Sequence, residues 1–432
     1  MDAVLKVKPY VSSKRVMVIP AGSEIGLEIF RSVHPSTHFD LVGAGYSNDH
    51  AAYVYPDYHA GIPWVDNDDF VPALVRLCRR TQADFIFPAH DSAVLKLAES
   101  ADQLPATLIG SPVQTARICR SKSETYRFLA DKIPTPVTYS VNDSVDGPRF
   151  LKPDAGQGSK GTFRAENIEE VLLLVRRDPS LLISEYLPGP EYTIDCFTDR
   201  FGVLRFAGGR SRSRIASGIS VSATAVDHPA FREYAEIINR HLKFQGAWFF
   251  QLKERASSEL VLLEIAPRIS GTSGYFRNKG VNLPLLSLYD AMDIDIQISP
   301  NSYTLTMDRA LQNRFKSDLQ FKAAYIDLDD TLIVRGQINT ALITFIYQCW
   351  NEQKAVHLVT RHRGDLPSTL QQFALTSCFT SIVHLQAGEP KSRAISENDS
   401  ILIDDSYRER AEVAAARGIP AFGLDMLEML LR

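Results

Sequence analysis

Two acidic residues, separated by a single position, follow a short apolar segment late in the chain. Asp327 and Asp329 lie in the sequence DLDDT, directly after the apolar residues 323–326. Two carboxylates at a strand end can divide the work of phosphate-ester cleavage. One attacks phosphorus and binds Mg²⁺, while the other gives a proton to the leaving group and later takes one from water. A calcium-type loop or a capped turn would give the same letters, so the pattern alone leaves both interpretations open.

A glycine-rich segment in the middle of the chain could bind phosphate. Residues 150–163 read FLKPDAGQGSKGTF, in which Gly156, Gly158 and Gly161 fit the spacing GxGxxG. A dinucleotide fingerprint needs a helix after the glycines, a P-loop needs a lysine after its last glycine, and a kinase needs later HRD and DFG elements; none is present. We therefore expect a hairpin whose tip donates backbone N–H groups to phosphate, with Lys152 on the incoming strand. An ordinary hairpin turn is the alternative.

Further residues of chemical interest flank this loop in a fixed order. Lys122 lies on a helix that begins with the capping-box pattern of Ser121 and Glu124. Downstream, residues 182–195 read as a strand, a Pro-Gly turn and a second strand. Two more strands are expected over 248–252 and 260–265, and the second runs into the sequence EIAPRISG.

This ordered set resembles the ATP-grasp enzymes of the carbamoyl-phosphate-synthase-like and carboxylate–amine ligase kind, over about residues 15–300. The resemblance implies that ATP phosphates are held by Lys122 and Lys152 under a loop containing Gly156, Gly158, Ser159 and Gly161. It implies adenine contacts from the backbone of Glu185, Tyr186 and Leu187, and ribose contacts from Glu191. It also implies Mg²⁺ ligation by Gln251 and Glu264, with Mn²⁺ as the alternative metal, and a γ-phosphate contact from Arg268. These residue types suit the chemistry, because Mg²⁺ prefers hard oxygen ligands and phosphoryl transfer depends on positioning and charge neutralisation.

One position departs from the family pattern E-x-N-P-R. Ala266 stands where the family has asparagine, and an alanine side chain cannot ligate a metal. The change removes one oxygen donor from a second metal, so we expect slower turnover or a metal held partly by water or another side chain. A degenerate ATP-binding domain is the alternative.

Three later segments complete the acidic motif. Residues 357–360 form an expected strand ending in Thr360, Lys391 follows a Glu-Pro pair, and residues 401–405 are an apolar strand ending in Asp404 and Asp405. Together with DLDDT they resemble the haloacid-dehalogenase-like (HAD) phosphatases, over residues 321–432. The resemblance implies that Asp327 is the nucleophile and Asp329 the general acid and base, and that Thr360 and Lys391 bind the phosphoryl group. A metal site would include Asp327, Asp329 and Asp404. Only about thirty residues separate Thr331 from Thr360, and Thr360 from Lys391, which leaves no room for a cap domain.

The sequence gives weaker evidence on which residues would bind the acceptor substrate. Arginines at positions 205, 210, 212 and 214 precede the Ser-Gly pair at 217–218 and would suit a carboxylate or phosphate; Arg210 and Arg214 are the candidates. Alternation along an exposed strand would give the same letters. Asp91 ends an expected strand near the crevice of an open α/β sheet, although it could equally cap a helix.

Composition limits the class of protein. The chain has 432 residues, Lys+Arg 47 against Asp+Glu 51, a net charge of −4 and 45% hydrophobic residues. Near-neutral charge argues against nucleic acid or an anionic membrane as the main partner. The five cysteines form no metal or disulfide pattern, and the longest apolar run near the N-terminus is Val16 to Ile19. We therefore expect a soluble cytoplasmic protein, with small-molecule carboxylate and amine or phosphate-ester substrates and a homodimer as an open alternative.

The predicted organisation is α/β throughout. Residues 1–115 alternate strand and helix, which favours a Rossmann-like pre-ATP-grasp domain with a parallel sheet. Residues 116–300 would be an ATP-grasp fold of two α+β lobes, 301–320 a linker, and 321–432 a capless, Rossmann-like HAD domain. The leading hypothesis is a bifunctional enzyme that joins a carboxylate to an amine with release of ADP and also hydrolyses a phosphate ester. The alternatives are a phosphatase with a regulatory or degenerate ATP-binding module, and an ATP-grasp kinase.

Overall fold

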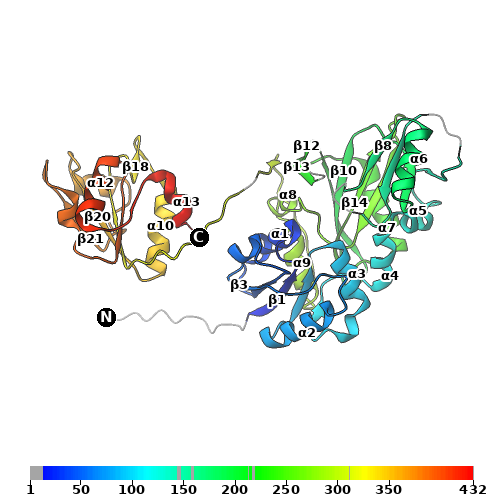
Figure 1. The fold of residues 1–432 in the computed structure, drawn as a ribbon, viewed down its shortest axis with the longest axis horizontal. Coiled ribbons are helices and arrows are strands. Elements are labelled where there is room, and N and C mark those ends of the chain that lie inside the picture. The colour runs from blue at the N-terminus through cyan, green and yellow to red at the C-terminus, as the bar shows by residue number, and fades with distance from the viewer. Residues whose placement is uncertain are drawn as a thin grey trace. The chain divides into compact units, whose positions relative to one another are not determined.

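The chain divides into two compact units between Gln312 and Asn313. The computed structural model describes residues 13–143, 147–156, 160–212, 214–216, 219–310 and 312–431. Figure 1 shows the elements of both units, which are described separately below. None of the described helices is long and apolar enough to cross a membrane.

The first unit begins with a five-stranded parallel sheet in the order β3-β2-β1-β4-β5. Its strands are β1 (Lys14–Ile19), β2 (Phe39–Ala44), β3 (Asp57–His59), β4 (Phe85–Pro88) and β5 (Thr107–Leu108). The connections carry α1 (Glu24–Val33), α2 (Phe70–Thr81) and α3 (Asp91–Glu99), with short 3₁₀ turns η1 (His50–Tyr53) and η2 (Ala101–Gln103). Val16 and Val18 pack into one apolar core, whereas Met17 and Ile19 pack into another. The sheet is therefore covered on both faces, as an all-parallel sheet requires.

Two antiparallel sheets follow, joined to the first by α4 (Val113–Arg120) and α5 (Lys122–Leu129). The smaller lobe has the strand order β6-β9-β7-β8, formed by β6 (Thr138–Tyr139), β7 (Arg149–Pro153), β8 (Phe163–Ala165) and β9 (Leu181–Glu185), with α6 (Ile168–Arg177). The larger lobe has the order β11-β10-β14-β15, formed by β10 (Glu191–Thr198), β11 (Leu204–Ser211), β14 (Gly246–Glu254) and β15 (Leu260–Ala266). Helix α7 (Pro229–His241) contributes to the core of this lobe, and α8 (Gly274–Arg277) and α9 (Leu283–Asp290) follow β15.

A third, small sheet changes the expected extent of the linker. Its strands are β12 (Arg214–Ala216), β13 (Ile219–Thr224) and β16 (Thr306–Asp308), in the order β12-β13-β16. Because β16 pairs with β13, residues 306–308 of the expected linker 301–320 are part of the first unit.

The second unit is built on another five-stranded parallel sheet, in the order β21-β20-β17-β22-β23. Its strands are β17 (Ala323–Ile326), β20 (Ala355–Thr360), β21 (Ser381–His384), β22 (Ser400–Ile403) and β23 (Ala421–Phe422). The helices are α10 (Thr340–Asn351), α11 (Leu366–Gln372), α12 (Tyr407–Arg417) and α13 (Leu427–Leu430), with 3₁₀ turns η3 (Lys391–Ala394) and η4 (Leu424–Met426).

The segment after DLDDT is not directly a helix. A two-stranded hairpin, β18 (Ile333–Val334) and β19 (Gln337–Ile338), comes first, and the helix α10 begins only at Thr340. Arg335 and Gly336 at the hairpin turn both have positive φ, which is the conformation that a tight two-residue hairpin requires.

Candidate active sites

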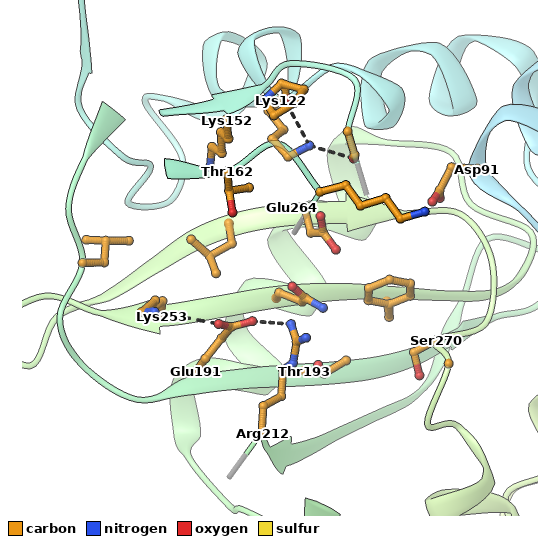
Figure 2. A pocket seen from close by; sticks show the side chains of 18 of the residues that line it. Asp91, Lys122, Lys152, Thr162, Glu191, Thr193, Arg212, Lys253, Glu264 and Ser270 are labelled. Carbon is orange, nitrogen blue, oxygen red and sulfur yellow. Dashed lines mark hydrogen bonds and ion pairs between the residues drawn. The ribbon is translucent and has the colours of Figure 1, made fainter. Parts of the chain in front are cut away.

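The first unit contains a cavity of about 360 Å³ lined by both antiparallel lobes and by the first sheet's helices α1 and α3. Figure 2 shows Lys122 and Lys152 on one side of it and Glu264 and Thr193 on the strands that face them. The sequence-predicted residues that line it are Asp91, Lys122, Lys152, Gly156, Glu185, Tyr186, Leu187, Glu191, Arg210, Gln251, Glu264 and Arg268. Gly158 and Ser159 lie outside the described residues, and Arg214 and Gly161 are not among the lining residues.

Strand register places the two expected metal ligands side by side. Gln251 of β14 is directly opposite Glu264 of β15, and Gln251 is also opposite Thr193 of β10. Residues opposite each other in an antiparallel pair share one face of the sheet. Within the described part of the chain, neither the Gln251 nor the Glu264 side chain has a hydrogen bond or ion pair, so both keep free oxygen atoms at the cavity. An amide and a carboxylate oxygen are donors that Mg²⁺ accepts.

The two lysines are held in different ways. The Nζ of Lys122 donates to the backbone carbonyls of Gly156 at 3.0 Å and Asp154 at 3.3 Å. The Nζ of Lys152 is buried and donates to the Oη of Tyr126 at 2.6 Å. Burial, reinforced by the charge of Lys122, lowers the pKa of Lys152 to about 7. Lys152 is thus poised to gain a proton when an anion arrives.

Asp154, which was not predicted as a site residue, fixes the start of α5. Its carboxylate accepts from the Ser121 hydroxyl at 2.6 Å and from the Ser123 N–H at 2.7 Å. The Ser121 hydroxyl also accepts from the N–H of Glu124, which is the expected half of the capping box. The Glu124 side chain instead pairs with Arg127. Asp154 therefore ties the end of β7 to the helix that carries Lys122.

Two of the residues expected to contact the nucleoside, Glu185 and Glu191, already have protein partners for their carboxylates. The Glu185 carboxylate is engaged by Arg255 at 2.6 Å and by the Val137 N–H at 3.1 Å, so its side chain braces the junction between the lobes. Glu191 lies between Arg212, which donates to it through a very short contact, and Lys253, whose Nζ is 3.9 Å away (Figure 2). Arg212 and Lys253 were not predicted as site residues in this role. The signal that could have found them is alternation, because each is two residues beyond a candidate, Arg210 and Gln251 respectively.

Arg268 is paired with a residue of the first sheet's helix layer. Its Nε and Nη2 donate to the two carboxylate oxygens of Asp91 at 2.7 and 2.5 Å. Burial alone would raise the pKa of Asp91, but Arg268 lowers it below its ordinary value. His90, rather than Asp91, caps α3, accepting the Ser92 N–H at its Nδ1. Asp91 therefore reaches the cavity as expected, with Arg268 as its partner.

The arginine group separates into different environments. Arg210 is buried and forms an ion pair with Asp195 at 2.8 Å, whereas Arg214 is exposed and pairs with Asp308 at 2.5 Å. Arg205 pairs with Asp199 at 2.5 Å. Only Arg210 and Arg212 of this group line the cavity. Strand position, rather than arginine density, decides which of them can meet a ligand.

Ala266 occupies a buried position directly opposite Phe249. The ring of Phe249 lies 5.1 Å from the guanidinium carbon of Arg268. The place of the family's asparagine is thus apolar in this chain, with no side-chain oxygen at position 266.

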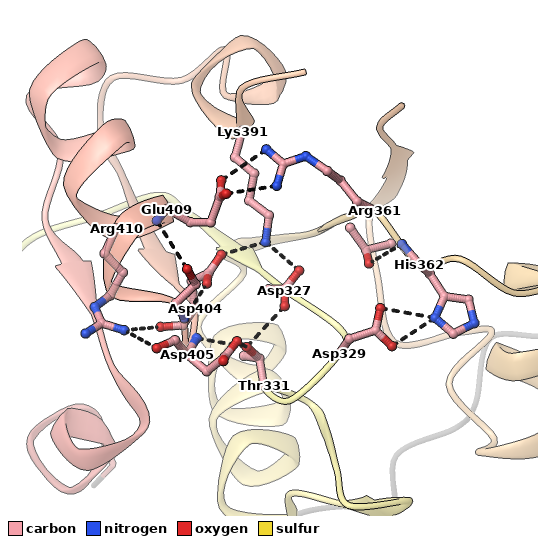
Figure 3. Close-up of polar contacts among 12 residues, drawn as sticks. Asp327, Asp329, Thr331, Arg361, His362, Lys391, Asp404, Asp405, Glu409 and Arg410 are labelled. Carbon is pink, nitrogen blue, oxygen red and sulfur yellow. Dashed lines mark hydrogen bonds and ion pairs between the residues drawn. The ribbon is translucent and has the colours of Figure 1, made fainter. Parts of the chain in front are cut away.

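The second unit gathers acidic side chains at the carboxyl ends of its central strands (Figure 3). Asp327 follows β17 and Asp404 follows β22, and Lys391 bridges them with Nζ–O distances of 2.5 and 2.6 Å. Burial alone would lower the pKa of Lys391, but the two carboxylates raise it above its ordinary value. Carboxylate oxygens of Asp327, Asp404 and Asp405 lie within 4.8 Å of one another, which is a donor set that a divalent cation could share.

Asp329 and Thr360 occupy the other side of this group. Asp329 is outside the cluster of three acids and contacts the Nδ1 of His362 at 2.9 Å, and its role as a metal ligand stays a prediction. Thr360 is buried at the end of β20, where its hydroxyl accepts the His362 N–H at 3.1 Å. The Thr331 hydroxyl is within hydrogen-bond distance of both the Asp327 and the Asp405 carboxylates, at 3.2 and 3.0 Å. His362 was missed because it belongs to none of the sequence motifs, and Thr331, although it is the last residue of DLDDT, was given no role there.

Comparisons with known proteins agree on the first unit. A sequence model of the family described as "ATP-grasp in the biosynthetic pathway with Ter operon" matches residues 177–310. No curated protein matches the chain. Similar solved structures include the biotin carboxylase domain of Hydrogenobacter thermophilus 2-oxoglutarate carboxylase, 17% identical, covering 66% of this chain and 71% of that one with a TM-score of 0.57.

Two further structures show the same likeness. The L-amino acid ligase from Bacillus licheniformis is 17% identical, with 65% of this chain and 74% of that chain covered and a TM-score of 0.54. N5-carboxyaminoimidazole synthetase from Staphylococcus aureus is 14% identical, with 66% and 78% covered and a TM-score of 0.53. Identities this low show a shared fold, and the first unit of the chain therefore has the ATP-grasp fold.

Proposed function

We propose that the first unit is an ATP-dependent carboxylate–amine ligase. The observation that carries the proposal is the cavity in which Lys122 and Lys152 face the side-by-side pair Gln251 and Glu264. Two cations and two free oxygen donors on opposite walls suit a nucleotide polyphosphate with Mg²⁺. Gln251 and Glu264 would hold the metal, which when bound would neutralise charge on the phosphoryl oxygens.

The proposed reaction has two steps that balance. A carboxylate oxygen of the acceptor attacks the γ-phosphorus of ATP, the bond from that phosphorus to the β–γ bridging oxygen breaks, and ADP leaves. An amine nitrogen then attacks the acyl carbon of the acyl phosphate, inorganic phosphate departs and the nitrogen loses a proton. Lys122, Lys152 and Arg268 would position and neutralise the phosphoryl group in the first step.

The similar structures support this chemistry. The Hydrogenobacter biotin carboxylase domain was solved with MgADP, ADP and bicarbonate, and the Bacillus protein is named as an L-amino acid ligase. The first structure contains bicarbonate, and the second protein is named for amino acids, which carry a carboxylate. The MgADP in the first structure supports ATP and Mg²⁺ as cofactors of this chain.

We further propose that the second unit is a HAD-type phosphatase. The ion pairs of Lys391 with Asp327 and Asp404 favour this function. The lysine ammonium group holds the carboxylate of Asp327, the proposed nucleophile, beside the group of three acids that could bind a divalent metal ion. Asp327 would attack the phosphorus of an ester, the alkoxide would take a proton from Asp329, and water would then release phosphate from the aspartyl phosphate.

The ligase proposal is tested with the Asp327→Asn variant, which silences the second site. The variant is given MgATP with pooled amino acids and sugar acids, with and without an amine, and nucleotides and new masses are followed. ADP that requires both a carboxylate and an amine, with a mass equal to their condensation, is the expected result. A phosphorylated product that retains the phosphoryl group would instead identify a kinase.

Ala266 favours one rival, a phosphatase whose ATP-grasp unit only senses nucleotide. Restoring the family's donor with Ala266→Asn tests it. A gain in ADP formation with unchanged phosphatase activity would support catalysis by the first unit. ADP absent from both proteins, with phosphatase activity that responds to ATP, would favour the sensor.

A further inference from the structure

Arg210 is among the largest fully buried side chains of the protein, with 1% of its surface exposed, yet it lines the cavity. Its Nε donates to Asp195 at 2.8 Å and its Nη2 donates to the Ser270 hydroxyl at 2.7 Å. Ser270 in turn donates to the other oxygen of Asp195 at 2.6 Å. This closed ring of three side chains fixes the plane of the guanidinium.

The third nitrogen of Arg210, Nη1, has no hydrogen-bond partner among the residues that the structure describes. Nη1 is buried and makes no hydrogen bond within the described part of the chain. A buried donor left unpaired is unfavourable, and natural proteins rarely keep one without a reason. Because the residue lines the cavity, an occupant of the cavity is the natural source of the missing acceptor.

The position of Arg210 in the cavity indicates whether its free N–H meets the nucleotide or the acceptor substrate. Ser270, its partner, is two residues beyond Arg268, and Figure 2 shows Ser270 and Asp91 at the end of the pocket away from Glu191 and Lys253. Strand β11, which carries Arg210, is at the opposite edge of its sheet from β15, which carries Glu264. Ser270 is thus at the far end of the pocket from the expected ribose contact Glu191. Arg210 is in register with Gln251 and Glu264 across the sheet, two and three strands away, so it is in the row of the expected metal ligands.

We propose that Arg210 is the recognition residue for the reacting carboxylate of the acceptor, which accepts a hydrogen bond from Nη1. This inference rests on the proposed ligase function and names the group that its cavity selects. A guanidinium held by Asp195 and Ser270 costs little to order when a carboxylate arrives, because its orientation is already fixed. The same donor would discriminate against a carboxamide, which carries no charge and has only one acceptor oxygen.

The test compares acids with their amides. Binding of each protein L-amino acid and of its carboxamide is measured by calorimetry on full-length Asp327→Asn protein with MgADP, and ADP formation from MgATP is measured in parallel. The background variant should prefer at least one acid to its amide by tenfold or more. Arg210→Lys, which keeps a cation beside Asp195 but removes Nη1, should reduce that preference to about twofold or less while leaving the Kd for MgADP unchanged.

Matched variants keep the result interpretable. Arg214→Lys changes an exposed arginine outside the cavity and should keep the full preference. Ser270→Ala leaves the pair of Arg210 and Asp195 in place and should weaken the preference for acid over amide by a smaller factor. This variant tests the inference if Arg210→Lys fails to fold. Retained preference in a folded Arg210→Lys protein would overturn the inference while the ligase stands. Weaker MgADP binding with intact preference would assign Nη1 to nucleotide phosphate instead. If no acid binds or elicits ADP in the background protein, the ligase proposal fails, and the inference with it.

Discussion

Lys152 is a cation whose charge depends on its surroundings. Its pKa of about 7 means that the ligand-free protein loses this charge as the pH rises above neutrality. Nucleotide phosphate favours the protonated form, so the pKa rises on binding and a proton is taken up. Affinity for MgADP should therefore be constant below pH 7 and fall above it, by up to about tenfold per pH unit, until the pKa of the complex is reached.

Calorimetry at pH 8 in buffers of different ionisation enthalpy measures the proton uptake directly. The Lys152→Arg variant keeps a permanent charge and should show neither the uptake nor the pH dependence. Identical pH profiles for the two proteins would assign the dependence to another group.

Asp91 holds the side chain expected to contact the γ-phosphate. Replacing it with asparagine leaves the charge of Arg268 in a largely buried site, where loss of one ion-pair partner costs about 3–5 kcal/mol. We expect Asp91→Asn to lower the free energy of unfolding by about that amount in urea titrations and to reduce ADP formation. The control is Glu99→Gln, which breaks the exposed pair with Arg117 and should cost about 0–1 kcal/mol. Equal losses in the two variants would contradict the role given to Asp91.

At the scale of single residues, the sequence predicts well which residues line the cavity. It predicts less well which partners their side chains contact. Lys122, Lys152 and Glu264 all line it. The hydrogen bond of Lys152 to Tyr126 and the pairing of Arg268 with Asp91 join residues far apart in the chain, so no local pattern reports them. Arg214 is not among the residues that line the cavity, because a high density of arginines does not indicate which of them face it.

At the scale of elements, the pairing of β14 with β15 builds the expected metal site. Glu264→Gln removes the charged ligand while preserving side-chain size, so nucleotide binding should weaken about tenfold or more in Mg²⁺ and change little in EDTA. The measurement is the Kd for ADP under both conditions. Glu233→Gln, an exposed change on α7, should leave both values unaltered. Equal weakening in Mg²⁺ and EDTA would argue against metal ligation by Glu264.

Elements with a strong apolar pattern are the ones that the sequence predicts. The apolar segment 323–326 coincides with β17, and the expected strands over 248–252 and 260–265 lie within β14 and β15. The strand β3, with the sequence DYH, has no apolar pattern and exists because β2 offers it an edge. The hairpin of β18 and β19 was missed for a related reason, since two-residue strands are defined by their turn rather than by burial.

At the scale of the whole molecule, each unit has apolar cores made of its own residues. The cores of the first unit draw on residues up to Met307, and those of the second begin at Leu319. Between them, residues 312–318 are exposed and have no regular secondary structure. Fusion of two sites in one chain is compatible with consecutive reactions but does not require either unit to support the other.

Limited trypsin digestion should therefore cut first at Arg314 or Lys316 and leave two resistant fragments, because exposed backbone without regular structure fits a protease site. The fragment ending near Gln312 should retain MgADP binding, since every described residue lining its cavity comes from the first unit. The fragment beginning near Asn313 should retain cleavage of a generic phosphate ester, because Asp327, Lys391 and Asp404 all lie within it. Mass spectrometry locates the cut, and calorimetry and a colorimetric ester assay follow the two activities. Loss of either function from a fragment that still unfolds cooperatively would show that its site depends on the other unit, and would favour coupled catalysis over two independent reactions.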